Sequence, residues 1–185
     1  LMSQCPRGGM AAVKAPTEQV QALLPGELVV AAENERAMTV VAGSKEALQR
    51  FVTEALNVAH TMLAVSHAFH SPMMEPAAAE FRRLLEGRTF QEPQGVRFIS
   101  TLTGGVETAR LKTAEYWAEQ IVQPVRFLKA VETAWAEGAA KTVVELGPGS
   151  TLLTLAKRIV GEEGPQWIAS SHALRWGRGP GLFRH

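Results

Sequence analysis

Hydrophobic residues in the first third of the chain form two kinds of pattern, continuous runs and a regular spacing. Short apolar runs rich in small and β-branched residues predict four strands, at 9–13, 28–32, 38–43 and 61–65. Between them, apolar residues recur every three or four positions, which predicts two amphipathic helices, at 17–24 and 44–59. Thr17 and Ser44 stand where helix N-caps are expected. The order strand, helix, strand, strand, helix, strand predicts a ferredoxin-like βαββαβ subdomain over residues 10–65.

After residue 65 the pattern predicts longer helices that alternate with strands. The helices are expected at 74–87, 113–121, 126–138 and 151–160, and the strands at 96–101 and 141–146. The second strand is an apolar run, which predicts that it is buried. The alternation indicates an α/β fold. We assign residues 66–160 to a second subdomain, residues 1–9 to the end of one of its helices, and residues 161–185 to a linker or tail.

Composition narrows the class of protein. Hydrophobic residues make up 46% of the chain and charged residues 20%, with a net charge of +1, so no basic field favours nucleic acid or a membrane surface. The apolar runs are far shorter than the roughly 20 residues of a membrane-spanning helix. The single cysteine, Cys5, excludes an internal disulfide and favours a reducing, cytoplasmic location.

Two histidines, His67 and His70, lie three positions apart between the last strand of the first subdomain and the next helix. A metal site needs a third ligand, and since His60 is the only nearby histidine and no acidic cluster accompanies it, we predict none. Both histidines can be buried structural residues, or one can transfer protons. Ser71 and Pro72 form a good helix start, so the helix dipole disfavours the imidazolium of His70 and leaves it able to act as a base.

A glycine-rich turn, Glu145 to Ser150, follows the second predicted strand and precedes a helix. It lacks the lysine and the spacing of a phosphate-binding loop, and Pro148 removes one amide donor, so a tight structural turn is the simpler interpretation. The sequence contains no Gly-x-Ser-x-Gly motif, the signature of a nucleophilic serine in this fold class. Any chemistry that needs such a serine must obtain it from outside these 185 residues.

Three segments taken together resemble the malonyl-CoA:acyl carrier protein transacylases. They are VSHAFHSPMMEP at 65–76, YWAEQIVQPVRF at 116–127 and VVELGPGSTLLTLAKRI at 143–159. The HAFH form at 67–70 is similar to the acyltransferase domains of type I polyketide synthases. The resemblance covers roughly residues 1–160 and implies a ferredoxin-like insert plus the carboxyl-terminal part of an α/β-hydrolase-like acyltransferase subdomain.

The resemblance also implies a mechanism. A serine in a Gly-His-Ser-x-Gly elbow, expected upstream of this chain, attacks malonyl-CoA after a histidine that matches His70 takes its proton. The main-chain carbonyl at the position of Gln120 orients that histidine. Many polyketide synthase domains carry His and Arg where this chain has Gln120 and Val122, so the detailed site differs. The acyl group then passes to the phosphopantetheine thiol of an acyl carrier protein.

The substrate-binding residues implied by the resemblance are His67, Phe69 and Asn34. A bulky ring at position 69 fills the space that an α-methyl group would need, so HAFH implies selectivity for malonyl over methylmalonyl, a difference worth about 1–3 kcal/mol. The arginine that would clamp the malonyl carboxylate is also expected upstream. No cofactor is expected to bind.

The expected partners are an acyl carrier protein and neighbouring polyketide synthase domains, including the linker on the ketosynthase side, with neither nucleic acid nor membrane. Without its serine, the chain alone is expected to be inactive. Two alternatives remain: a non-catalytic fragment that docks a carrier protein, and a free-standing transacylase of fatty acid synthesis. His172 and His185 are expected to be exposed and without a role.

Overall fold

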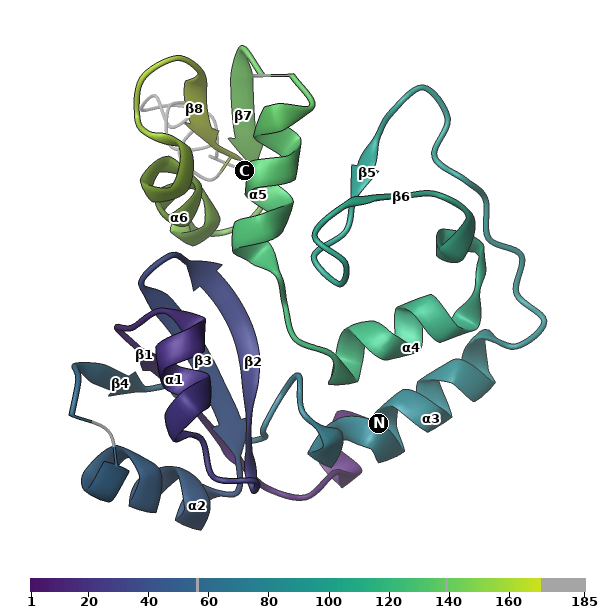
Figure 1. The fold of residues 1–185 in the computed structure, drawn as a ribbon. Coiled ribbons are helices and arrows are strands. Elements are labelled where there is room, and N and C mark those ends of the chain that lie inside the picture. Colours follow the sequence, from purple (N-terminus) through teal and green to yellow (C-terminus); the bar gives the residue numbers. More distant parts are fainter. Residues whose placement is uncertain (56, 139, 171–185) are drawn as a thin grey trace, which may run out of the picture. The chain divides into compact units, whose positions relative to one another are not determined.

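The computed structural model describes residues 1–55, 57–138 and 140–170. The chain folds into two compact units, residues 1–133 and 134–185, with the boundary inside one helix (Figure 1). The expectations for His172 and His185 lie outside the described residues. Within the described ranges no helix has the length and apolar character needed to cross a membrane.

A four-stranded antiparallel sheet forms the first part of unit 1. Its elements are β1 (Gly9–Val13), α1 (Thr17–Leu23), β2 (Leu28–Glu35), β3 (Met38–Gly43), α2 (Lys45–Arg50) with a π-helical turn (Phe51–Ala55), and β4 (His60–Met62). The strands lie in the order β2-β3-β1-β4, so β1 and β3 are central. This confirms the predicted succession of strands and helices.

Both faces of this sheet are covered. Ala11 and Val13 of β1 point into a cluster with side chains of α1 and α2, such as Val20 and Leu48. Met10 points to the opposite face and packs in a cluster that contains Ala68, from the loop that carries the HAFH motif. A strand buried on both faces is expected to be a continuous apolar run, which is why GMAAV contains no polar residue.

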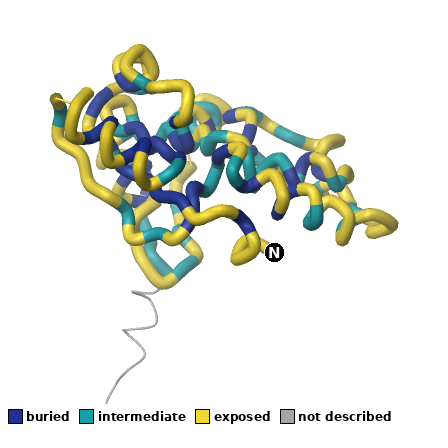
Figure 2. The backbone as a smooth tube through the Cα atoms, turned by 90° about the horizontal axis from the view of Figure 1, so that it is seen from below, coloured by how far each residue is buried: buried dark blue, intermediate teal, exposed yellow. Residues whose placement is uncertain are grey.

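The rest of unit 1 consists of helices around a short hairpin. Its elements are η1 (Met2–Gln4), η3 (Pro72–Met74), α3 (Glu75–Leu85), β5 (Phe98–Ile99), β6 (Val106–Glu107), η4 (Ala109–Lys112), α4 (Ala114–Val122) and α5 (Phe127–Ala136). Helices α3 and α4 pack against each other (Figure 1). The chain start at Leu1–Gln4 is exposed and is yellow in Figure 2. Strand β6, which pairs with β5, was not predicted.

Unit 2 contains a parallel pair of strands joined by a helix: β7 (Thr142–Glu145), α6 (Thr151–Val160) and β8 (Gln166–Ala169). Strand β8 was not predicted, and it lies in the segment assigned to a linker or tail. The prediction that β7 is buried was wrong, since its residues alternate between exposed and half-buried. Leu146, just after β7, is 84% exposed.

Several element boundaries also differ from the predictions. Pro16 is the N-cap of α1, and Thr17 is its first residue, with its hydroxyl 3.0 Å from that of Thr39. The N-cap prediction for Ser44 is confirmed, because its Oγ accepts a hydrogen bond from the Ala47 amide at 3.2 Å. The predicted helix over 44–59 is shorter, since its α-helical part ends at Arg50.

Candidate active site

His70 lies in the loop between β4 and η3, in an unusual backbone conformation. Its φ is +57°, and among the described residues it is the only non-glycine with positive φ. A left-handed backbone is disfavoured for residues with a Cβ, and it persists where the surrounding structure holds it in place. Here the His70 amide donates to the carbonyl of Ile121 in α4, at 3.3 Å.

The ring of His70 is held by the end of the same helix. Nδ1 lies 3.1 Å from the main-chain carbonyl of Gln123, and the carbonyl of Gln120 also interacts with the ring. Because a carbonyl only accepts, Nδ1 carries the hydrogen and Nε2 is left as the nitrogen that can accept a proton. The sequence prediction named Gln120 alone, whereas the structure also gives a hydrogen bond to the carbonyl of Gln123.

Burial sets the electrostatics of this ring. Removal from water lowers the pKa of His70 below its ordinary 6.5, and the carbonyls of Gln123 and Gln120 offset this only in part. The direction agrees with the sequence prediction of a neutral histidine. The largest cause of the lowered pKa is burial, and not the helix dipole expected from the sequence. A neutral imidazole at neutral pH is the form that acts as a general base.

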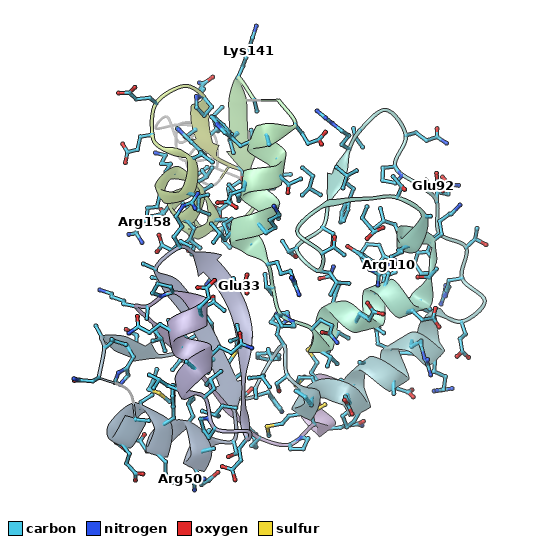
Figure 3. The ribbon with its side chains drawn as sticks, in the orientation of Figure 1. Glu33, Arg50, Glu92, Arg110, Lys141 and Arg158 are labelled. Carbon is cyan, nitrogen blue, oxygen red and sulfur yellow. The ribbon has the colours of Figure 1, made fainter. Side chains whose placement is uncertain are left out.

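The short segment between α4 and α5, Gln123–Arg126, connects three parts of unit 1. The Val125 amide donates to the Ala31 carbonyl of β2 at 2.9 Å, and the Val125 carbonyl accepts from the Glu33 amide at 2.8 Å. Glu33, labelled in Figure 3, marks this edge of β2. The Arg126 amide donates to Thr101 in the β5–β6 turn at 2.6 Å. The carbonyl that holds His70 therefore belongs to a segment that is hydrogen-bonded both to β2 and to the β5–β6 turn.

A chain of polar side chains, buried at Tyr116 and Ser100, joins α4 to the residue that follows β5. The Tyr116 hydroxyl donates to Ser100 Oγ at 2.7 Å and accepts from the side-chain amide of Gln120 at 2.9 Å. Ser100 Oγ also accepts from the Leu102 amide at 3.0 Å. Tyr116 is 0% exposed, so each of these polar groups depends on its partners. At the surface, Arg110 pairs with Glu119 of α4 at 2.6 Å (Figure 3).

His67 and Phe69 precede the base in the same loop. His67 is buried, and its Nδ1 lies 2.8 Å from the Ser66 hydroxyl. Its Nε2 is buried without a hydrogen-bond partner among the described residues. The Phe69 ring lies 5.9 Å from the His67 ring, tilted by 50°, and packs on two hydrophobic clusters, one with Met10 and one with Met74. Phe69 is therefore a packed side chain of fixed position, although half-buried.

Asn34 lies next to the last residue of β2 and is half-buried. Within the described ranges, the structure gives it no hydrogen bond to His67, Phe69 or His70. A pocket of about 310 Å³ lies between α3 and α4 and includes Gln123 in its lining, but none of the five residues predicted for the site lines it. The structure thus brings His67, Phe69, His70 and Gln120 together, and among the described residues no hydrogen bond joins Asn34 to them.

Backbone amides in and just after the glycine-rich turn that follows β7 donate to side chains of this chain. The Gly147 amide donates to Ser170 Oγ at 3.0 Å, and the Leu153 amide of α6 donates to the Glu145 carboxylate at 2.9 Å. These bonds favour the interpretation as a structural turn. In the part of the chain that the structure describes, no group of three or more His, Cys, Asp or Glu side chains is placed to bind a metal ion.

Sequence reasoning missed Gln123, Tyr116 and Ser100. A local signal exists for Gln123, because a residue before proline is driven to an extended backbone, and Gln123 has ψ of 154° at the end of α4. Such a residue turns its carbonyl away from the helical ladder. Tyr116 and Gln120 are four positions apart on one helix, which places them on the same face. No local pattern identifies Ser100 as their partner.

Comparison with known proteins identifies a family for this chain. The acyl transferase domain family matches residues 1–170. Polyketide synthase GfsA of Streptomyces halstedii is 37% identical over 185 residues, which cover 95% of this chain and 2% of that protein. Polyketide synthase GfsB of the same organism is 39% identical over 160 residues, covering 82% of this chain and 3% of that protein. The chain thus spans a small part of these relatives.

Solved structures give the same result for the fold. The acyltransferase domain from the second module of the salinomycin polyketide synthase matches with a TM-score of 0.82 and 30% identity, over 98% of this chain and 51% of that one. The acyltransferase domain of an iterative polyketide synthase in enediyne biosynthesis matches with a TM-score of 0.77 and 34% identity, over 92% and 44%. The chain spans about half the length of these domains, and the resemblance found in the sequence is confirmed.

Proposed function

Because this chain belongs to the acyl transferase domain family, we propose that it is the base-bearing part of a malonyl-selective acyltransferase domain in a type I polyketide synthase. In this proposal a malonyl group moves from malonyl-CoA to the phosphopantetheine thiol of an acyl carrier protein. The observation that carries it is the His70 ring, which is bound at Nδ1 by the Gln123 carbonyl and has its Nε2 available for a proton. His67 and Phe69, whose rings lie 5.9 Å apart, precede His70 in the same loop.

The proposed reaction has two steps, each with a proton transfer at Nε2 of His70. First, a serine hydroxyl supplied from outside this chain attacks the malonyl thioester while Nε2 takes its proton. The C–S bond breaks, and the proton on Nε2 passes to the leaving CoA sulfur. Second, Nε2 takes the proton of the phosphopantetheine thiol, which attacks the acyl-serine, and returns it to the serine oxygen. Charge and atoms balance without a cofactor.

Selectivity for malonyl is assigned to Phe69. Its ring is next to His70 in sequence and packs against two hydrophobic clusters, so it cannot move aside without a cost in packing. A substrate bearing an α-methyl group near the base would need that space. Shape exclusion of one methyl group supplies a discrimination of about 1–3 kcal/mol.

The remaining parts of the proposal concern the whole protein. The helices and strands after residue 65 would belong to an α/β-hydrolase-like subdomain completed by chain outside these residues. The carrier protein, neighbouring synthase domains and a cytoplasmic location follow from the similarity to polyketide synthases such as GfsA. The two alternatives drawn from the sequence are a docking fragment and a free-standing transacylase. The identity to polyketide synthases favours the synthase domain over both.

A mass measurement tests this function. The domain completed with its upstream sequence is incubated with malonyl-CoA or methylmalonyl-CoA, and then with a phosphopantetheinylated carrier protein. We expect a malonyl adduct on the domain, transfer of malonyl to the carrier, and much slower reaction with methylmalonyl-CoA. Residues 1–185 alone should form no adduct. A stable malonyl adduct on this chain would mean that it contains its own nucleophile, contrary to the proposal.

A further inference from the structure

Two hydrogen bonds join His70 to the end of α4, and a third contact beside it involves a side chain with no part in the proposed chemistry. The His70 amide is bound to Ile121 and its ring to Gln123, both near the end of α4. The third contact comes from the next residue, Ser71, which is 1% exposed. A buried hydroxyl that is not needed for packing calls for a partner, and Ser71 has two.

The two bonds of Ser71 lie on either side of His70. Its hydroxyl donates to the carbonyl of Ala68 at 2.6 Å and accepts from the amide of Met73 at 3.3 Å. The second bond is an ordinary cap of η3, and it is long. The first is short, points backward along the chain, and closes a loop around Phe69 and His70. Its acceptor is fixed as well, since Ala68 is fully buried in the cluster against the sheet.

We propose that Ser71 is a positioning residue for the base, whose hydroxyl closes the 68–71 loop and so holds His70 left-handed with its ring against Gln123. This inference rests on the proposed function only for the consequence in catalysis. Without the hydroxyl, the loop can relax toward ordinary backbone conformations, and the ring leaves the carbonyl that fixes which nitrogen carries the proton. Nε2 would then no longer be the fixed acceptor.

The test compares Ser71→Ala and Ser71→Thr with Ser44→Ala in the full-length polypeptide. Ser44 is a matched control, because its hydroxyl also caps a helix, α2, and its hydrogen bond at 3.2 Å is to the Ala47 amide of that helix. We expect Ser71→Ala to lower kcat for malonyl transfer at least tenfold with KM for malonyl-CoA within twofold. Ser71→Thr, which keeps a hydroxyl, should retain kcat within about threefold, and Ser44→Ala should keep kcat unchanged.

A second measurement does not depend on turnover. With histidine labelled in ¹⁵N, the His70 ring should show the Nδ1-protonated tautomer in the parent protein and in Ser44→Ala, and a mixture of tautomers in Ser71→Ala. If Ser71→Ala does not fold, Ser71→Cys replaces it, since a thiol keeps the volume but donates weakly.

The possible outcomes separate the two proposals. A Ser71→Ala protein with parental kcat and parental tautomer would overturn the positioning role, as would an equal loss of kcat in Ser44→Ala. If the parent protein transfers no malonyl at all, the proposed function fails, and the ¹⁵N spectrum alone decides the role of Ser71.

Discussion

The ring of His70 and the main-chain carbonyl of Gln123 lie 3.1 Å apart although 53 positions separate them in sequence. The carbonyl belongs to the last residue before Pro124, where α4 ends in an extended backbone. This contact leaves Nε2 as the acceptor nitrogen, and it is the geometric basis of the proposed proton transfer.

His70→Ala should remove the general base. In the domain completed with its serine, we expect kcat to fall by about 10²- to 10⁴-fold, the usual contribution of a positioned base. His60→Ala is the matched control, since His60 also has its Nδ1 near a carbonyl, that of Val58 at 3.3 Å, but is exposed on β4. It should leave kcat unchanged in the same carrier-protein assay. Equal losses in both variants would remove His70 from the mechanism.

The lowered pKa of His70 predicts a loss of stability in acid. Burial lowers the pKa of His70 in the folded protein below its value near 6.5 in the unfolded chain. The unfolded chain therefore binds more protons than the folded protein as pH falls below 6.5. The free energy of unfolding should therefore decrease through that window, and the acid limb of kcat should lie below pH 6.5. Urea titrations at pH 7.5 and 5.5 measure this. His70→Gln should show a smaller decrease than the parent, and identical decreases would contradict the shift.

Phe69→Ser should relax substrate choice and also cost stability. Opening space beside the base should lower the malonyl-to-methylmalonyl ratio of kcat/KM by about 10- to 200-fold. Loss of the half-buried ring should reduce the free energy of unfolding by about 2 kcal/mol. Phe98→Ser is the control, because Phe98 is a half-buried ring in another cluster, with Leu111 and Tyr116. It should reduce stability but keep the substrate ratio, and an unchanged ratio in Phe69→Ser would refute the selectivity role.

Tyr116→Phe should destabilise the protein through its lost hydroxyl alone. It leaves Ser100 Oγ and the Gln120 amide without their shared partner, at a cost of about 1–3 kcal/mol. Denaturation of Tyr116→Phe, Ser100→Ala and the double variant forms a cycle. The double variant should lose less than the sum of the two single variants. Strict additivity would show that the hydroxyls do not act together.

Gly8→Ala should disturb the HAFH loop, because Gly8 lies against Ala68 of that loop although it is far from it in sequence. A Cβ at Gly8 would lie 2.8 Å from the Cβ and the amide nitrogen of Ala68 and from the Gly43 carbonyl, too close for any of them. We expect a loss of about 1–3 kcal/mol, as for other overpacked sites, together with reduced kcat. Gly26→Ala is the control, since nothing lies within 4 Å of a Cβ there. A Gly8→Ala protein as stable as the parent would show that the loop yields without cost.

The first part of the fold follows from its sequence because each local signal agrees with the next. The short apolar runs of the strands, the three-to-four-residue spacing of apolar positions in the helices and the Ser44 cap all indicate the same element order. Strand β7 shows the limit of this reasoning. Its apolar run indicates burial, but burial depends on what covers it, and Val144 is 48% exposed in this chain. A short strand such as β6 gives almost no periodic signal at all.

Residue type is enough to make His70 a candidate base, whereas residue type alone does not identify the backbone features of the candidate site. His70 is visible as a histidine, but its left-handed φ is not, because histidine is normally right-handed or extended. The orienting carbonyl of Gln123 belongs to no side chain, so the pattern of residue types cannot distinguish it from that of Gln120. Burial, the first cause of the lowered pKa of His70, arises only when distant elements pack together.

The paired edge between β2 and Val125 limits how related domains can be recombined. Since Val125 exchanges two hydrogen bonds with Ala31 and Glu33, and Gln123 two positions earlier holds the base, the sheet and the base share one stretch of backbone. A chimera that takes residues 10–65 from a relative but keeps residues 123–126 of this chain would pair β2 with a segment from a different protein. Crossover points placed outside both segments should keep the pairing of β2 with Val125 intact.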